Sequence, residues 1–390
     1  MNMEFLSVKQ DKETCCGCAA CVDVCPVHAI EMKEDSEGFL YPKIDRERCI
    51  GCDRCVQVCG FHRGQKPDES AKAYALKHKN PIIRENSRSG AAFVGFSDFV
   101  LKQGGVVYGA VLQNDFTVAH CRAENADERQ KMTKAKYVQS NTSHVFLQVE
   151  QDLCDARLVM FSGTPCQVHG LQTFLRLRKV DTDRLLCCDI VCHGVPSPAV
   201  WRDYLHMIEN RFGQKVLSVE FRDKQFGWDS HFESFVLEDR PRKVVSREYA
   251  DLFGQAIMLR PCCHNCPFAS TERYSDLTLA DFWGIENVMP AFHDNQGVSL
   301  VLVNTEKGAE VLRKTMDCFD FWACSLDQVL QPRLRSPSTA SVRRAQFWQD
   351  RAAMPFDKLL KKYTTPTNLL GIIKKAVKEG LYRLGIRNHP

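Results

Sequence analysis

Short apolar runs alternate with amphipathic helical stretches over residues 69–345. The run at 158–162 is followed by a Gly-Thr-Pro turn and an amphipathic helix, and the run at 185–192 repeats that shape with a His-Gly-Val-Pro turn. Strands that alternate with helices are typical of an α/β domain. We therefore expect a mixed α+β chain in which this segment is an α/β domain.

Other segments fit the same domain. The segment 93–103 has the pattern of a helix, a further helix is expected within 127–156, and an apolar strand at 106–111 has an antiparallel partner at 116–120. Additional strands are predicted at 216–221, 231–237, 276–281 and 298–304, the last of them central in its sheet.

Two cysteine quartets lie in the N-terminal part, each with the spacing C-x2-C-x2-C-x3-C, and alternating residues around 35–38 predict a hairpin between them. This is the spacing of bacterial two-cluster ferredoxins, in which the fourth cysteine of a quartet binds the other cluster. We therefore predict two 4Fe-4S clusters, one bound by Cys15, Cys18, Cys21 and Cys59 and the other by Cys49, Cys52, Cys55 and Cys25.

The ferredoxin-like domain is predicted to span residues 1–68, with a polar linker at 61–72. The alternatives to two clusters are a zinc site, for which the displaced fourth cysteine has no use, or one degraded cluster site. Cys16 lies beside a ligand without fitting the spacing, which is the pattern of a small buried residue or a spare thiol.

The composition indicates the cellular compartment in which the protein is expected. The chain has 390 residues, 20 cysteines and a net charge of +4. No secretion signal is recognised at its start, and no run of about 18 apolar residues predicts a transmembrane helix. Thiolate–iron chemistry in a reducing cytoplasm therefore explains the cysteines better than disulfides do. The weak, dispersed charge gives no reason to expect nucleic-acid binding.

The segment 346–390 is predicted to be a separate basic, helical tail. Past residue 356 it carries eight Lys and Arg residues against two acidic ones, and apolar residues recur at helical spacing between 369 and 384. Such a helix could lie on an anionic membrane surface, or it could dock on the core or on a partner chain. We favour the docked arrangement.

A second group of cysteines lies in turns of the α/β domain. Cys166 is in GTPCQ, Cys192 is in CHG, and three more are in RPCCHNCPF. Strand-to-helix turns of α/β folds gather ligand-binding groups, and helix N-termini there favour thiolates and anions. A third cluster is therefore expected, with buried free thiols as the alternative. Its predicted ligands are Cys166, Cys192, Cys263 and Cys266.

The stretches GTPCQVHGL, DIVCHGVPSP, RPCCHNCPF and SDLTLADFWGI follow the quartets in this order. Together they resemble the beta-subunit family of deazaflavin (coenzyme F-420) hydrogenases and dehydrogenases, which also includes formate dehydrogenase beta subunits and a chlorophyll-cycle reductase. The resemblance covers residues 10–340. It implies an iron–sulfur flavoprotein that binds FAD, passes electrons between clusters and flavin, and exchanges hydride between the flavin and a substrate.

The resemblance also implies particular contacts. The family's Ser-Gly-Gly stretch matches Ser89 and Gly90, whereas Ala91 replaces the second glycine. A late Asp-x-Trp-Gly stretch matches 281–284. The residues that the resemblance places at FAD are Ser89, Gly90, Lys136, Tyr137, Gln139, Ser140, Gly163, Thr164, Pro165 and Gln167.

A protein with clusters and a flavin converts between one-electron carriers and two-electron chemistry. We expect ferredoxin or a redox partner subunit at one end and a small-molecule acceptor at the other, with either direction of electron flow. His193 is the candidate proton carrier, and Lys136 is the candidate partner of the flavin or of a phosphate. Their alternatives are a hydrogen bond to the backbone or to a cluster sulfide, and a solvated lysine on a helix.

Arg222, Asp223 and Trp228 are expected either to border the substrate pocket or to form a loop ion pair and a packed aromatic. Two other functions stay open at this level. One is a non-catalytic electron-transfer subunit, and the other is a cysteine-rich structural or zinc protein.

Overall fold

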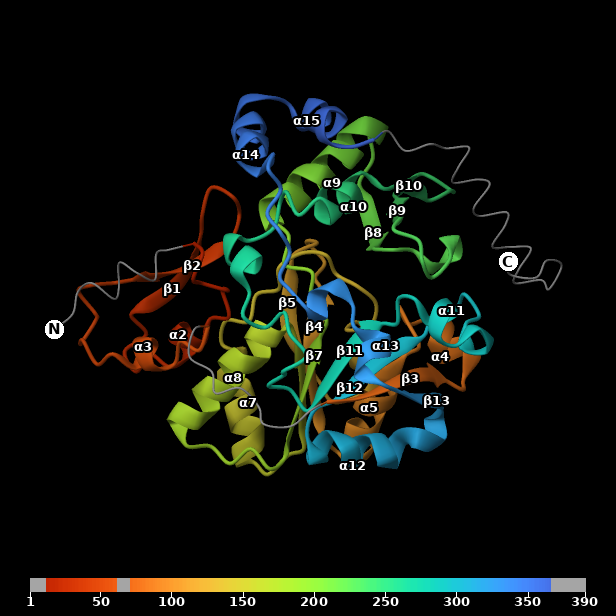
Figure 1. The fold of residues 1–390 in the computed structure, drawn as a ribbon. Coiled ribbons are helices and arrows are strands. Elements are labelled where there is room, and N and C mark those ends of the chain that lie inside the picture. The colour runs from red at the N-terminus through yellow and green to blue at the C-terminus, as the bar shows by residue number, and fades with distance from the viewer. Residues whose placement is uncertain (1–11, 62–70, 366–390) are drawn as a thin grey trace.

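The computed structural model describes residues 12–61 and 71–365, and its largest element is an eight-stranded sheet with the order β13-β3-β12-β11-β7-β6-β4-β5 (Figure 1). The inner strands β4, β6, β7 and β11 pair in parallel, and the outer pairings are antiparallel. The strands are β3 (Lys72–His78), β4 (Val106–Leu112), β5 (Val118–Ala123), β6 (Val159–Gly163), β7 (Leu185–Ile190), β11 (Leu277–Asp281), β12 (Ser299–Val303) and β13 (Phe319–Cys324).

Helices cover both faces of this sheet. On one face lie α7 (Val145–Cys154) and α8 (Pro165–Arg178), and on the other lie α5 (Ala92–Lys102) and α12 (Glu306–Thr315). Successive side chains of a strand point to opposite faces. Phe161 of β6 accordingly packs among α7 and α8, whereas Met160 packs among α5 and α12. Both faces of the inner strands are therefore buried, which explains their continuous apolar runs.

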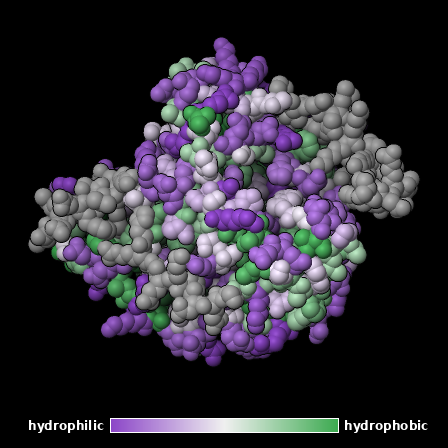
Figure 2. Space-filling view, in the orientation of Figure 1, coloured by the Kyte–Doolittle hydropathy of each residue, from purple (hydrophilic) through white to green (hydrophobic). Residues whose placement is uncertain are grey.

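A smaller sheet with the order β10-β9-β8 lies beside the large one, at the top of Figure 1. Trp201, Tyr204, Tyr249 and Phe347 fill the core between this sheet and its helices. Figure 2 shows mainly hydrophilic side chains on the outside of α14 and α15. The elements are β8 (Val216–Glu220), β9 (Glu233–Leu237), β10 (Val244–Ser246), α9 (Pro198–Phe212), α10 (Glu248–Gly254), α14 (Arg344–Ala353) and α15 (Phe356–Tyr363).

The N-terminal domain contains the expected hairpin and two short helices. The hairpin pairs β1 (Ile30–Glu34) with β2 (Leu40–Ile44). Each helix, α2 (Ala20–Asp23) or α3 (Arg54–Gln57), carries one quartet cysteine, Cys21 or Cys55. Short helices after a cysteine loop are what the two-cluster pattern predicts.

Asp23 fastens this domain to the large one. Its carboxylate accepts the backbone N–H groups of His144 and Phe146 at 2.8 and 3.1 Å, at the N-terminus of α7. Those N–H groups have no partner within the helix, so the carboxylate acts as an N-terminal cap supplied by another domain. The hydroxyl groups of Thr142 and Thr173 also donate to the carbonyl groups of Cys18 and Val58.

Most predicted elements of the large domain are present. The segment 93–103 is α5, 106–111 is β4, and 298–304 contains β12, which has neighbours on both sides. The helix predicted within 127–156 is only partly correct, because the chain is non-helical between α6 and α7. Sequence patterns did not predict β3, β10 or β13. The remaining short helices are α4 (Pro81–Glu85), α6 (Ala126–Gln130), α11 (Ile285–Val288) and α13 (Leu326–Val329).

The first part of the predicted tail docks on the core. Leu359, Leu360 and Tyr363 of α15 are buried in the same cluster as α9. The helix expected between 369 and 384, and most of the predicted linker, lie outside the described residues. None of the helices in 12–61 and 71–365 has the length and apolar character needed to span a membrane.

Candidate functional site

Cysteines of both N-terminal quartets line one internal cavity. Its lining includes the four residues predicted to bind the first cluster, Cys15, Cys18, Cys21 and Cys59. Helix α8 closes another side, where Gly170 lies so close to Cys18 that an added Cβ would be 2.9 Å from the thiol Sγ. Cys59 belongs to the second quartet, so the crossed pairing expected from the spacing brings these residues to one place.

The second predicted set is more open to solvent. Cys25 and Cys55 pack in one apolar cluster, and the thiol of Cys25 accepts the N–H of Ala29 at 3.2 Å. Cys49 and Cys52 are exposed. Among the residues that the structure describes, no three His, Cys, Asp or Glu side chains are arranged to hold a single metal ion. Four thiolates around a four-iron cluster are spread more widely than the ligands of one ion.

Four cysteines of the large domain converge from three separate segments. Cys166 lies at the start of α8, Cys192 follows β7, and Cys263 and Cys266 lie at the 3-10 helix Pro261–Asn265. Burial raises the pKa of Cys192, and the thiols of Cys263, Cys166 and Cys266 raise it further. Burial also raises the pKa of Cys266 to about 12, with added contributions from Cys166 and Cys263. Cys166, Cys263 and Cys266 also pack against one apolar cluster, so the four thiols lie near one another.

Two further thiols lie next to this group. Cys16 lies between Cys166 and Cys18, and hydrogen bonds with both thiols raise its pKa. Cys262 is buried and interacts with Cys263. Cys16 therefore contacts both a cysteine of the N-terminal cavity, Cys18, and a cysteine of the second group, Cys166.

The segment 136–140 lies beside the N-terminal cavity and the second cysteine group. The ammonium of Lys136 donates to the carbonyl of Thr133 at 2.6 Å, and burial, followed by repulsion from Lys134, lowers its pKa to about 7. The segment is not helical, so the alternative of a solvated lysine on a helix is wrong. At the other end, the side-chain amide of Gln139 donates to the carbonyl of Cys16 at 3.1 Å.

The turn 163–167 meets the same segment. The side chain of Gln167 caps α8 by accepting the N–H of Thr164 at 2.9 Å, and its amide group donates to the carbonyl of Ser140 at 3.4 Å. His120, which sequence patterns did not single out, bonds through its ring nitrogens to Ser140 and to the carbonyl of Ser162. The predicted FAD contacts Ser140, Gly163, Thr164, Pro165 and Gln167 are therefore neighbours in space.

Ser89 and Gly90 lie elsewhere at the edge of this region. Ser89 donates its hydroxyl to the carbonyl of Val298 at 2.7 Å, and a Cβ added to Gly90 would be 2.1 Å from the carbonyl oxygen of Leu76. Gly90 thus permits close packing against the sheet. The preceding Arg88 connects this stretch to the rest, because it donates to the carbonyl of Arg222.

Ala91 occupies a left-handed backbone conformation, with φ of +66°. A side chain at such a position costs about 1–2 kcal/mol, which glycine avoids. We therefore expect Ala91→Gly to raise the free energy of unfolding by about 0.5–1 kcal/mol, after the greater chain entropy of glycine is allowed for. Thermal unfolding of the two proteins measures this. Ala92→Gly, inside α5, should instead destabilise, and stabilisation by both would contradict the backbone explanation.

His193 has protein partners at both ring nitrogens. Nε2 lies 3.2 Å from the carbonyl oxygen of Phe253, and Nδ1 lies 3.3 Å from the hydroxyl of Ser338. Burial lowers its pKa, so the ring is neutral near pH 7. Its role in proton transfer stays a prediction, and the backbone hydrogen bond weighed against it is present.

Arg222 forms a buried ion pair with Asp281 across 2.5 Å, rather than with the adjacent Asp223. Trp228 is buried and donates its indole N–H to the same carboxylate at 2.7 Å, and its ring stacks on Trp283. The hydroxyl of Tyr137 lies 3.4 Å from the guanidinium. The aromatic packing and ion pair weighed as alternatives are thus present, with Asp281 as the partner that local sequence did not reveal.

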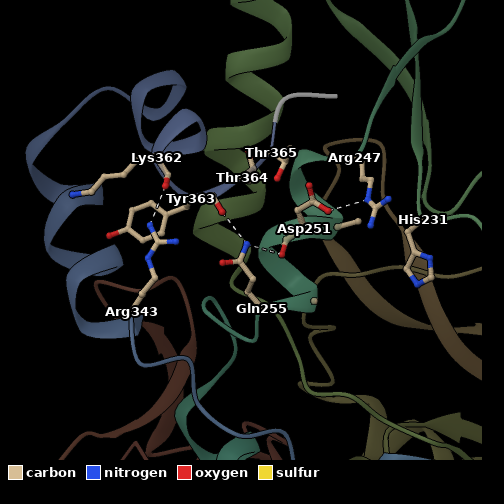
Figure 3. A pocket seen from close by; sticks show the side chains of 11 residues that line it. His231, Arg247, Asp251, Gln255, Arg343, Lys362, Tyr363, Thr364 and Thr365 are labelled. Atoms are coloured by element: carbon tan, nitrogen blue, oxygen red, sulfur yellow. Dashed lines mark hydrogen bonds and ion pairs between the residues drawn. The ribbon is translucent and has the colours of Figure 1, made fainter. Parts of the chain in front are cut away.

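A cavity of about 660 Å³ opens between α10 and α15 (Figure 3). Arg247 and His231 line one side of it, and Arg343 lines the other. The ring of His231 also stacks on Trp283, at 6.1 Å between centroids, so the cavity adjoins the Arg222–Asp281 pair. Burial and the positive charge of Arg222 lower the pKa of His231 to about 4.

Comparison with known families agrees with this architecture. Residues 156–328 match the family model for the C terminus of the coenzyme F420 hydrogenase/dehydrogenase beta subunit, and residues 14–62 match a 4Fe-4S dicluster domain. The segment 156–328 is therefore similar to the C-terminal part of these coenzyme F420 hydrogenase/dehydrogenase beta subunits. This match confirms the resemblance that the sequence motifs indicated.

In this beta-subunit-like chain the family segment contains Cys166, Cys192, Cys263 and Cys266, whereas Ser89 and the segment 136–140 precede it. A chain of the F420-reducing NiFe hydrogenase complex from Methanosarcina barkeri is similar with a TM-score of 0.47 and 14% identity, over 82% of this chain and 94% of that one. No curated protein matches the chain.

Proposed function

We propose that this protein is an iron–sulfur flavoprotein oxidoreductase that exchanges electrons between a one-electron donor and a small-molecule acceptor. The observation that carries the proposal is the convergence of Cys166, Cys192, Cys263 and Cys266 between the N-terminal cavity and the segment 136–140. This group of four cysteines therefore connects the predicted cluster domain to the predicted flavin contacts. Similarity to a family of hydrogenase and dehydrogenase subunits supports the same class of reaction.

The cysteine groups have the chemistry that clusters require. Bound clusters would supply one-electron transfer, and the N-terminal cavity and the second cysteine group would hold two of them. Val195 donates its N–H to the thiol of Cys263 at 3.4 Å, which is the kind of bond that stabilises a thiolate or cluster sulfur.

The region around Lys136 fits a flavin nucleotide. A buried ammonium bonded to a backbone carbonyl, without a carboxylate partner among the described residues, favours an added anion such as a phosphate or a reduced flavin ring. Bound FAD would supply two-electron chemistry next to one-electron carriers. Lys136 would neutralise its charge, and the turn 163–167 would approach it with backbone groups.

The cavity lined by Arg247, Arg343 and His231 is the proposed acceptor site (Figure 3). Arg247 is paired with Asp251 of the same lining at 2.9 Å, whereas Arg343 has no carboxylate partner among the described residues, so Arg343 is the group that favours an acceptor with anionic groups. His231 is neutral near pH 7, so it offers a hydrogen bond rather than a charge. The acceptor itself, whether a deazaflavin or another small molecule, is left to experiment.

Anaerobic purification with iron, sulfide and flavin analysis tests the proposal directly. Three clusters correspond to about 12 irons per chain. We expect that content together with one FAD, and turnover of an acceptor in a screen. Protein that contains neither flavin nor the capacity to take up FAD would refute the flavoprotein assignment.

A second candidate is an electron-transfer subunit that performs no chemistry of its own. The position of His193 favours it, because both ring nitrogens bond to protein groups and the residue lines neither of the two cavities described above. Such a subunit would reduce no acceptor until ferredoxin or another redox partner subunit was added. Turnover by the isolated chain would exclude it.

Lys136 predicts a pH dependence of flavin binding. Its pKa of about 7 is below the ordinary value, so the charged form is present below pH 7 and is lost as the pH rises. We expect FAD affinity to fall between about pH 7 and 9, and Lys136→Met to bind FAD at least about tenfold more weakly, since charged hydrogen bonds contribute about 1.5–3 kcal/mol. Fluorescence titration measures both. Lys131→Met, at an exposed position just after α6, is the control and should retain wild-type affinity.

A further inference from the structure

Arg260 lies wholly inside the protein, with no exposed surface, although it carries a charge. Its backbone is fixed by two hydrogen bonds, from its N–H to the carbonyl of Val195 at 3.0 Å and from the N–H of Cys263 to its own carbonyl at 2.9 Å. The residue is therefore attached to the second cysteine group, while its side chain points to the N-terminal domain.

The guanidinium is held by the first cysteine loop. Nε donates to the carbonyl of Cys15 at 2.6 Å, and Nη2 lies 3.6 Å from the thiol Sγ of the same residue. Further hydrogen bonds go to the carbonyl of Leu40 and the side-chain oxygen of Gln139, each at 3.0 Å. The ring of Tyr41 covers one face, at 4.0 Å from the guanidinium carbon.

No carboxylate in the described part of the chain pairs with this charge. Among the ion pairs of residues 12–61 and 71–365, none includes Arg260, and its side-chain partners are carbonyl groups, an amide, an aromatic ring and a thiol. Burying an unpaired charge is costly. Of these partners, the thiol of Cys15 is the one that becomes an anion when it binds a metal. The anion that balances this guanidinium must therefore come from the cysteine side.

We propose that Arg260 is the counter-charge of the cluster bound through Cys15 and that it raises the reduction potential of this cluster. This inference rests on the proposed cluster at Cys15, Cys18, Cys21 and Cys59. A cluster with four thiolate ligands is anionic and gains another negative charge when it accepts an electron. A fixed positive charge in a medium of low dielectric constant stabilises the reduced form more than the oxidised form.

The position of Arg260 determines which of the proposed redox sites it stabilises in the reduced form. The residue contacts Cys15 through its side chain and Cys263 through its backbone. It therefore favours an electron on the N-terminal cluster nearest the second cysteine group. Gly17, with φ of +72°, leaves the space needed, because a Cβ there would be 2.9 Å from Nη1 of Arg260.

Redox titration of the anaerobic holoprotein, followed by electron paramagnetic resonance, tests the inference. In Arg260→Met the reduction potential of one step should fall by ~59 mV. For a one-electron couple, this shift raises the ratio of oxidised to reduced cluster about tenfold at a given potential. Arg260→Lys keeps the charge, so its reduction potentials should stay close to those of the wild-type protein. Arg202→Met removes another arginine that joins the two domains, through Glu34, and should leave every step unchanged.

Gln139→Glu provides a second variant if Arg260→Met does not fold. It places a carboxylate beside the guanidinium, and the same step should move in the same direction. Iron and sulfide are measured in each sample. Low iron in the wild-type protein would refute the proposed clusters. Full iron with unchanged potentials in the folded variants would instead overturn the role of Arg260 alone.

Discussion

Cys263→Ser is expected to lower the iron content of the anaerobically purified protein from about 12 to about 8 atoms per chain, because one four-iron cluster is lost. A serine hydroxyl is a much poorer anionic ligand than a thiolate. Cys263 lies with Cys166, Cys192 and Cys266, so its replacement should affect that group and leave the N-terminal cavity intact. Iron and sulfide analysis measures the loss.

The control for this variant is Cys154→Ser, since Cys154 is exposed at the end of α7. It should retain all the iron. Cys262→Ser is the closer comparison, because Cys262 is adjacent in sequence but is not one of the predicted ligands. Full iron in Cys263→Ser together with a loss in Cys262→Ser would mean that the ligand assignment is wrong by one residue.

Asp281→Asn is expected to destabilise the folded protein by about 3–5 kcal/mol, because removing one partner leaves a buried charge uncompensated. Arg222 and Trp228 both bond to this carboxylate, and Arg88 adds a second positive charge nearby. Although burial opposes ionisation, these charges lower the pKa of Asp281 to about 2. The carboxylate is therefore ionised throughout the physiological range.

Anaerobic thermal unfolding measures this effect. At roughly 2–4 °C per kcal/mol, the apparent midpoint should fall by about 10 °C. Glu310→Gln breaks an exposed ion pair with Lys314 and should leave the midpoint unchanged. An unchanged midpoint for Asp281→Asn would show that the Arg222–Asp281 pair is not a structural requirement. FAD uptake by the same samples then separates stability from cofactor binding.

Local spacing predicted the N-terminal cysteine sets, because all their ligands lie within one short segment. The second cysteine group depended on topology. Cys166 and Cys192 follow the parallel strands β6 and β7, whose C-terminal ends meet at one edge of the sheet, and this rule allowed their proximity to be predicted.

Other features could not be predicted locally. The partners of Arg222 and Arg260 are 59 and 245 residues away in sequence, and no pattern near an arginine indicates such a contact. Strand β3 was missed because its apolar run, 73–76, is only four residues long and is flanked by Lys72 and Lys77. Residues 131–144 resemble a helix in composition. Instead of forming a helix, they run beside the ends of β5 and β6, and Ser140 bonds to side chains there. Tertiary contacts therefore override the local helical preference.

The long separation between Cys15 and Arg260 has a consequence for biosynthesis. The N-terminal domain leaves the ribosome well before the helix α8 and the arginine that complete its cavity, and domains generally fold in the order of their synthesis. A cluster assembled on the nascent domain therefore stays open to solvent and oxygen until translation has passed residue 260. Oxygen damage in this protein should consequently depend on the conditions during expression as much as on those during purification.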